Sequence, residues 1–121
     1  MIIADTSVWI DFLRNDSAQF RSALNRREIA THTVIIGELA AGNLRNRQQT
    51  LTMLRSLHRS HEGQVDECMH YLELHRLHGR GLNWNDIQLL VAAHLTHAPI
   101  WSLDQKLAEA AGKFKLRYLA R

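Results

Sequence analysis

The sequence predicts an α/β protein with a small, mainly parallel sheet flanked by helices, and three observations lead to this fold class. Short apolar runs that stop abruptly at polar residues alternate with longer segments of helical periodicity. Strands that alternate with helices form a parallel sheet covered on both faces. The length of 121 residues suits one domain with a real core, and no linker, repeat or low-complexity stretch divides it. We therefore expect a single domain over residues 1–121.

The first half of the chain contains two strand signals among four helix signals. The apolar run at residues 2–4 ends at Asp5, which predicts a buried strand followed by a helix N-cap. Ser17 can cap a second helix, and Gly42 can end a third. The expected elements, in order, are a strand at 2–4, a helix to about 14, a helix from 17 to 25, a strand at 28–31, a helix from about 33 to 41 and a helix from 47 to about 57.

The second half of the chain has weaker strand signals and a strongly apolar helix. Residues 58–63 are ambiguous between a loop and an edge strand, and Gly79 and Gly81 interrupt the helical pattern. Either Asn83 or Asn85 can cap the apolar helix that follows. The expected elements are an amphipathic helix within 64–77, a helix from 86 to 95, a strand at 100–103, a helix from 105 to 112 and a final strand at 115–119.

The composition indicates a soluble, cytoplasmic protein. Hydrophobic residues make up 45% of the chain and charged residues 22%, which is ordinary for a globular domain. The single cysteine, Cys68, cannot form an internal disulfide. The N-terminus does not look like a signal peptide, and the longest apolar run, residues 89–93, is far shorter than the roughly 20 residues of a membrane span. The net charge of +3 favours a polyanionic partner only mildly.

Four acidic side chains stand where a site of an open parallel sheet is expected. Asp5 and Asp104 each end a predicted strand and begin a helix, and ligands of such sheets bind outside the carboxyl ends of the strands. Asp86 opens the most apolar helix, and Glu38 lies inside another apolar helix. Each residue also has a structural explanation. An aspartate can cap a helix N-terminus, and Glu38 can extend into solvent.

A metal ion would explain why four acids gather without matching bases. Neighbouring carboxylates repel one another, and divalent cations are the usual remedy. Oxygen ligands suit Mg²⁺ or Mn²⁺. The eight histidines include pairs three residues apart, yet no cysteine cluster accompanies them, so a zinc site is not expected. The three tryptophans are expected in the core or in a groove rather than as platforms for nucleobases.

Four segments resemble, in order, the acidic motifs of VapC-type PIN-domain toxins. They are residues 3–13 (IADTSVWIDFL), 37–39 (GEL), 81–86 (GLNWND) and 100–104 (IWSLD). The resemblance spans nearly the whole chain. It implies a three-layer PIN-like sandwich with five parallel strands in the order 3-2-1-4-5.

The same resemblance implies an acidic pocket formed by Asp5, Glu38, Asp86 and Asp104. Asp5 and Asp86 are expected as direct ligands of Mg²⁺ or Mn²⁺, and the other two as ligands or holders of water. Supporting hydroxyls complete the expected site. Thr6 or Ser7 resembles the residue that supports the first acid, and Ser102 stands where the family usually has threonine.

The implied function is that of a metal-dependent endoribonuclease, the toxin of a type II, VapBC-like toxin–antitoxin system. Such enzymes hydrolyse RNA and leave a 5′-phosphate and a 3′-hydroxyl. A catalytically inactive PIN-like module that binds nucleic acid or protein is the alternative, although all four acids are present. A phosphoacceptor receiver needs paired acids after its first strand, and a haloacid-dehalogenase-like phosphatase needs two aspartates flanking one residue. The sequence has neither pattern.

A small VapB-like antitoxin is the implied protein partner. An arginine of the antitoxin can pair with the acidic pocket, because its guanidinium matches carboxylates bidentately. We expect its apolar anchor in a groove on the N-terminal half, with Trp9 exposed as the main contact. We also expect the toxin to pair as a homodimer. The alternative is that all of the residues considered for the groove belong to the core, which is the expectation for Phe12 and Leu24. The residues considered are Trp9, Phe12, Leu13, Phe20, Leu24, Leu51 and Leu54.

Overall fold

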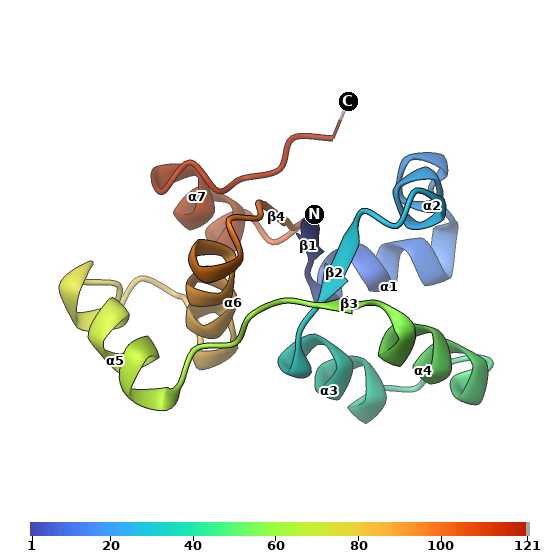
Figure 1. The fold of residues 1–121 in the computed structure, drawn as a ribbon, viewed down its shortest axis with the longest axis horizontal. Coiled ribbons are helices and arrows are strands. Elements are labelled where there is room, and N and C mark those ends of the chain that lie inside the picture. Colours follow the sequence, from blue (N-terminus) through green and yellow to red (C-terminus); the bar gives the residue numbers. More distant parts are fainter. Residues whose placement is uncertain (121) are drawn as a thin grey trace.

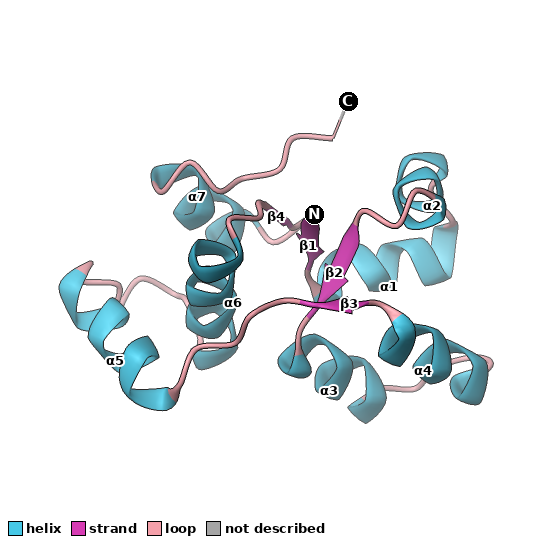
Figure 2. Ribbon diagram, viewed as in Figure 1, coloured by secondary structure: helices cyan, strands magenta, loops and turns pink. Residues whose placement is uncertain are grey.

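A parallel sheet of four short strands runs through the middle of the molecule, with helices on both sides (Figure 1 and Figure 2). The computed structural model describes residues 1–120. The strands are β1 (Ile2–Ala4), β2 (Ile29–Thr31), β3 (His58–Arg59) and β4 (Ile100–Trp101). The helices are α1 (Thr6–Asn15), α2 (Ala18–Asn25), α3 (Thr33–Ala41), α4 (Arg47–Ser56), α5 (Val65–Leu74), α6 (Trp84–Thr96) and α7 (Gln105–Lys113).

The strand order is β3-β2-β1-β4, and all pairs are parallel. Strand β1 occupies the centre because its residues are apolar on both faces. Ile3 pairs with Ala30 on one side and with Ile100 on the other, and all three are fully buried. In Figure 1, helices α1 to α4 lie on one side of the strands and α5 to α7 on the other. This arrangement confirms the predicted α/β sandwich.

The predicted fifth strand is absent from the sheet of the described residues. The segment that should form it makes one isolated parallel bridge, between Ile100 and Arg117. Its backbone does hydrogen-bond Ile100 on both sides, from Ile100 N to Leu116 O and from Tyr118 N to Ile100 O. Lys115, the first residue of the predicted strand, has a φ of +59°, so the chain is not extended there. The chain therefore follows the predicted course and stops short of a full strand.

Caps and positive φ values explain where the helices differ from their predicted bounds. Asn83 caps α6, which settles the alternative between two asparagines and starts the helix at Trp84. Helix α5 ends at Leu74 although the amphipathic pattern continues to residue 77, because Arg76 takes a φ of +52°. The ambiguous residues 58–63 contain the short edge strand β3.

The core closes around aromatic side chains from α1, α2 and β4. The ring of Phe20 lies 4.8 Å from Trp9, 4.8 Å from Phe12 and 5.5 Å from Trp101 between centroids. Trp9 is 0% exposed, so the prediction that it is exposed as an interface anchor is wrong. The physical reason is that α1 turns this side chain toward the sheet and α2, where edge-to-face aromatic packing holds it. Within residues 1–120, no helix has the length and apolar content that crossing a bilayer requires.

Candidate active site

Asp5 lies at the carboxyl end of the central strand and caps α1. One carboxylate oxygen accepts a hydrogen bond from the backbone N–H of Val8, at 3.2 Å. The hydroxyls of Ser7 and Ser102 donate to the two oxygens of the same carboxylate. Asp5 is only 5% exposed. The carboxylate is thus buried, oriented and held by donors from two separate segments.

The two serines are themselves fixed by the backbone of the turn between β4 and α7. Ser7 Oγ accepts from the N–H of Leu103 at 2.9 Å, and Ser102 Oγ accepts from the N–H of Asp104 at 3.0 Å. Each hydroxyl therefore directs its own proton toward Asp5. These contacts join the ends of β1 and β4 and fix the first acid relative to the fourth.

The pKa of Asp5 is raised because burial disfavours the charged carboxylate, and the hydrogen bonds from Ser102, Ser7 and Val8 counteract this increase. These hydrogen bonds affect the protonation of Asp5. They favour the ionised form, which is the form that binds a metal ion.

Asp86 lies in the first turn of α6 and forms a capping box with Asn83. Its Oδ2 accepts from the Asn83 N–H at 2.9 Å, while the Asp86 N–H donates to Asn83 Oδ1 at 2.8 Å. Burial raises the pKa of Asp86, and the negative charges of Asp104, Asp5 and Glu38 raise it further. This dependence on three other carboxylates indicates that all four acids share one neighbourhood.

Glu38 and Asp104 are exposed members of this group. Thr6 Oγ1 donates to Glu38 Oε1 at 2.9 Å and so connects α1 to α3. Asp104 caps α7, and its Oδ1 accepts from the N–H groups of Lys106 and Leu107. The two hydroxyls that follow the first acid thus have different partners, Ser7 on Asp5 and Thr6 on Glu38.

Helix capping and membership of the acidic group occur together in the three aspartates. Asp5, Asp86 and Asp104 each accept backbone N–H groups at the start of a helix. Three oxygens remain without a hydrogen-bond donor among residues 1–120. They are Asp86 Oδ1, Asp104 Oδ2 and Glu38 Oε2. The capping explanation for these residues is therefore correct but incomplete.

The donor set fits a hard divalent cation. All four side chains offer carboxylate oxygens, and no Lys, Arg or His of the described part of the chain forms an ion pair with any of them. Among residues 1–120, no three His, Cys, Asp or Glu side chains are arranged closely enough to hold a metal ion. The residues therefore provide the chemistry of an Mg²⁺ or Mn²⁺ site, and binding requires a tighter arrangement than this one.

The fold and the order of these acids agree with a known family. A family model described as the PIN domain matches residues 2–113. The chain belongs to the PIN-domain family. It is 35% identical over 114 residues to proteins named Ribonuclease VapC32 from two strains of Mycobacterium tuberculosis, CDC 1551 / Oshkosh and ATCC 25618 / H37Rv. The match covers 93% of this chain and 92% of each relative. The predicted VapC-type PIN domain is confirmed.

A solved structure supports the fold assignment alone. The crystal structure of PAE2754 from Pyrobaculum aerophilum is similar with a TM-score of 0.61 and 18% sequence identity. The similarity covers 89% of this chain and 77% of that one.

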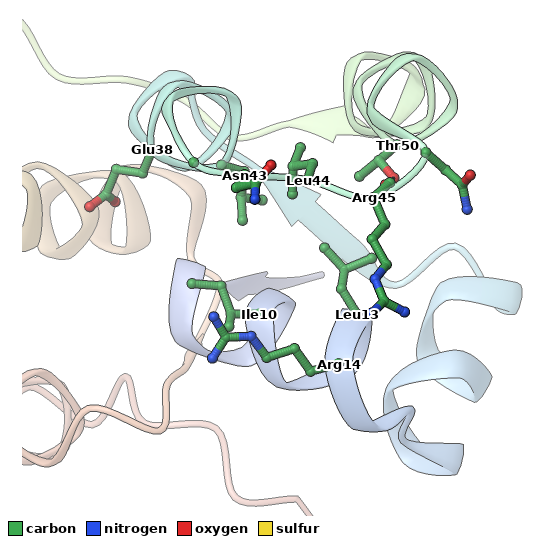
Figure 3. A pocket seen from close by; sticks show the side chains of 11 residues that line it. Ile10, Leu13, Arg14, Glu38, Asn43, Leu44, Arg45 and Thr50 are labelled. Atoms are coloured by element: carbon green, nitrogen blue, oxygen red, sulfur yellow. The ribbon is translucent and has the colours of Figure 1, made fainter.

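This PIN domain also has a groove of about 620 Å³ between α1 and the α3–α4 segment (Figure 3). Ile10 and Leu13 of α1 lie on one side and Leu44 on the other, with Arg14 and Arg45 reaching over the apolar floor. The groove is lined by Ile10, Leu13, Arg14, Glu38, Leu39, Gly42, Asn43, Leu44, Arg45, Asn46 and Thr50.

Of the seven residues considered for the groove, Leu13 is in its lining, and Phe12 and Leu24 pack against the core as expected. Trp9, Phe20 and Leu54 are buried in the core. The sequence did contain a signal for the groove-facing side of α1, because Leu13 and Arg14 come three and four residues after Ile10 and so lie on the same side of a helix. The Trp9 face and the Ile10 face of α1 are both apolar, and the periodicity does not say which one faces the sheet.

Proposed function

We propose that this chain is a metal-dependent endoribonuclease, the toxin of a VapBC-type toxin–antitoxin system. The observation that carries the proposal is the shared neighbourhood of Asp5, Glu38, Asp86 and Asp104 at the carboxyl ends of the strands, seen in the raised pKa of Asp86. The name Ribonuclease VapC32 of the relatives supports RNA as the substrate. The toxin would act in the cytoplasm, where its RNA substrates are.

The chemistry follows from these residues. When bound, an Mg²⁺ or Mn²⁺ ion activates a water molecule and stabilises charge on the phosphodiester oxygens. Asp5 and Asp86 would hold it, with Glu38 and Asp104 as further ligands or holders of water. Asp5 is kept ionised and correctly oriented by the serine hydroxyls. Outer-shell hydrogen bonds of this kind support the affinity of metal sites.

The direct test is cleavage of labelled RNA in Mn²⁺ or Mg²⁺ and in chelator. Asp5→Asn and Asp86→Asn each remove one charge at nearly constant volume and are expected to abolish cleavage. Asp11→Asn is the matched control, because Asp11 is an acid outside the acidic group and its side chain accepts, among residues 1–120, from the Asn15 amide alone. Cleavage that survives Asp5→Asn, or that is unaffected by chelator, would contradict the metal site, whereas no cleavage by the wild type would point to the alternative of a non-catalytic binding module.

The groove is proposed as the antitoxin-binding surface. Ile10 and Leu13 are 37% and 39% exposed, so they can anchor an apolar segment of the antitoxin. Glu38 belongs both to the groove lining and to the acidic group. A segment lying in the groove can therefore extend an arginine onto the acids and block them. Arg14 and Arg45 favour acidic residues elsewhere in the same segment.

Co-expression with the small protein encoded beside the toxin tests this surface. Leu13→Asp is expected to release the antitoxin, whereas Leu119→Asp, at an exposed leucine outside the groove, is expected to retain it. An antitoxin variant that lacks its arginine should bind but inhibit less. Full binding of the antitoxin by Leu13→Asp would show that the groove is not the binding surface, without affecting the proposed nuclease activity.

A homodimer is proposed from the exposed apolar side chains of α5. Val65, Met69 and Leu74 are 66%, 45% and 62% exposed on this one short helix. Light scattering of the purified toxin measures the mass directly. Leu74→Asp is expected to shift it toward the monomer, and an unchanged monomeric mass in the wild type contradicts the proposal.

A further inference from the structure

A lysine stands near the acidic group, at the start of α7. Lys106 is the second residue of α7, two residues after Asp104. The first turn of a helix carries the positive end of the macrodipole, which disfavours a cation there. Asp104 at the N-cap is the acid next to it, and no further acidic side chain lies in the first turn of α7. A cation at this place needs another explanation than helix stability.

The side chain of Lys106 is held against the loop that leads into α6. A Cβ added to Gly81 would lie 2.6 Å from Lys106 Nζ and 2.8 Å from its Cδ, so the lysine stem covers the bare glycine backbone. Gly81 also has a φ of +80°, a conformation that other residues rarely adopt. Two residues later, Asn83 caps α6 together with Asp86. The side chain of Lys106 thus runs from the first turn of α7 to the loop that precedes α6.

Neither Lys106 nor Arg80, the residue before Gly81, forms an ion pair among residues 1–120. The ion pairs of the described residues involve other basic side chains, namely Arg21, Arg26, His32 and Arg59. Lys106 and Arg80 have no carboxylate within 4.0 Å among residues 1–120. Arg80 is exposed between Gly79 and Gly81, two glycines with positive φ. Both positive charges remain available to an anionic ligand.

We propose that Lys106, supported by Arg80, binds a backbone phosphate of the RNA next to the scissile bond and positions the strand over the acidic pocket. This inference rests on the proposed ribonuclease function. RNA must bring its phosphates up to four carboxylates, and a cation at the rim offsets that repulsion. An ammonium group binds phosphate as a compact point charge. Lys106 is a substrate-positioning residue, and it takes no part in the bond-breaking step.

The test compares Lys106→Met with Lys113→Met, which removes an equal charge from the far end of α7. The probe is a fluorescein-labelled single-stranded RNA of mixed sequence, with binding followed by anisotropy in chelator so that no cleavage occurs. One phosphate contact contributes about 0.7 to the slope of log Kd against log salt for a single strand. Lys106→Met should therefore weaken binding about eightfold at about 50 mM salt, with the difference vanishing toward about 1 M.

Three further readouts separate this role from a structural one. Lys106→Arg keeps the charge and should restore both the affinity and the salt slope, and Lys113→Met should match the wild type within about twofold. In the cleavage assay, Lys106→Met should raise KM and leave kcat unchanged.

An unchanged salt slope in Lys106→Met overturns the inference, as does a fall in kcat at constant KM, which would place the lysine on the acids instead. If the wild type cleaves no RNA in Mn²⁺, the proposed function fails, and the anisotropy data still decide whether Lys106 contacts RNA.

Discussion

Ser102 offers a sharp test of how the acidic pocket is held together. Its hydroxyl donates to Asp5 Oδ2 and accepts from the Asp104 N–H, so Ser102→Ala removes both contacts. The Asp104 N–H lies in an exposed region and can turn to water, so its loss costs little. The lost bond to Asp5 is different, because that carboxylate is buried and Ser102 is the strongest influence that lowers its pKa.

The magnitude follows from the charge on the acceptor. A hydrogen bond to a charged group contributes about 1.5–3 kcal/mol to the free energy of unfolding. For a domain of this size, that loss corresponds to a fall in Tm of about 5–15 °C. The loss is greatest at a pH where Asp5 is ionised and shrinks at low pH, because protonation removes the charge that strengthened the bond. The pKa of Asp5 rises further in the variant.

The assay combines thermal melts in chelator at pH 8 and pH 4 with a pH–rate profile in Mn²⁺. Ser102→Ala should melt well below the wild type at pH 8 and close to it at pH 4. The acid limb of its rate profile should move to higher pH. Ser102→Thr keeps the hydroxyl and should restore both properties. Equal Tm values for the alanine variant and the wild type at pH 8, or an unmoved acid limb, would refute the reasoning.

Three other outcomes follow from the same contacts. Asp86 has a raised pKa, so its contribution to stability is present at low pH and lost as the pH rises. In chelator at neutral pH, Asp86→Asn should therefore melt above the wild type. Mn²⁺ at a hundredfold excess over its Kd should stabilise the wild type by about 2.7 kcal/mol and the variant much less. His32 is buried and caps α3 by accepting from the Val34 N–H, and its pKa is lowered from 6.5, chiefly by burial. The stability of the wild type should therefore fall as the pH drops below about 6.5. His32→Asn keeps a capping acceptor and should flatten that dependence in melts at pH 7.5 and 5. Thr6→Val frees Glu38 and should lower kcat about tenfold, whereas Thr52→Val on the exposed side of α4 should not.

The sequence was informative wherever a local signal and the packed structure agree. Ser17 and Asp104 predicted the starts of two helices because their side chains satisfy backbone N–H groups within three residues. Asp5, Asp86 and Asp104 were picked out from strand ends and helix starts, which are local features, whereas Glu38 lies inside α3 and was picked out as an acid in an apolar helix. The order of the strands came from the family resemblance and not from periodicity, because pairing partners lie far apart in the chain.

The sequence misled, or left alternatives open, where several positions carry equivalent signals. Trp9 and Leu13 lie on two apolar faces of the same helix, and only the packing of α1 against the sheet decides which is buried. Thr6 and Ser7 both follow Asp5 with a hydroxyl, and their partners depend on the direction that each takes in the first turn of α1. Long-range geometry, absent from a single sequence, resolves both pairs.

The coincidence of helix caps and pocket acids has a physical basis in this fold. Strands β1 and β4 end at the same edge of the sheet, where the helices that follow them start. A helix start presents unpaired N–H groups and the positive end of its dipole, both of which favour a carboxylate. Asp5, Asp86 and Asp104 each satisfy N–H groups with one oxygen or more, and Asp86 and Asp104 keep a second oxygen without a donor among the described residues. Helix starts thus lower the cost of gathering acids that a metal ion would then bind.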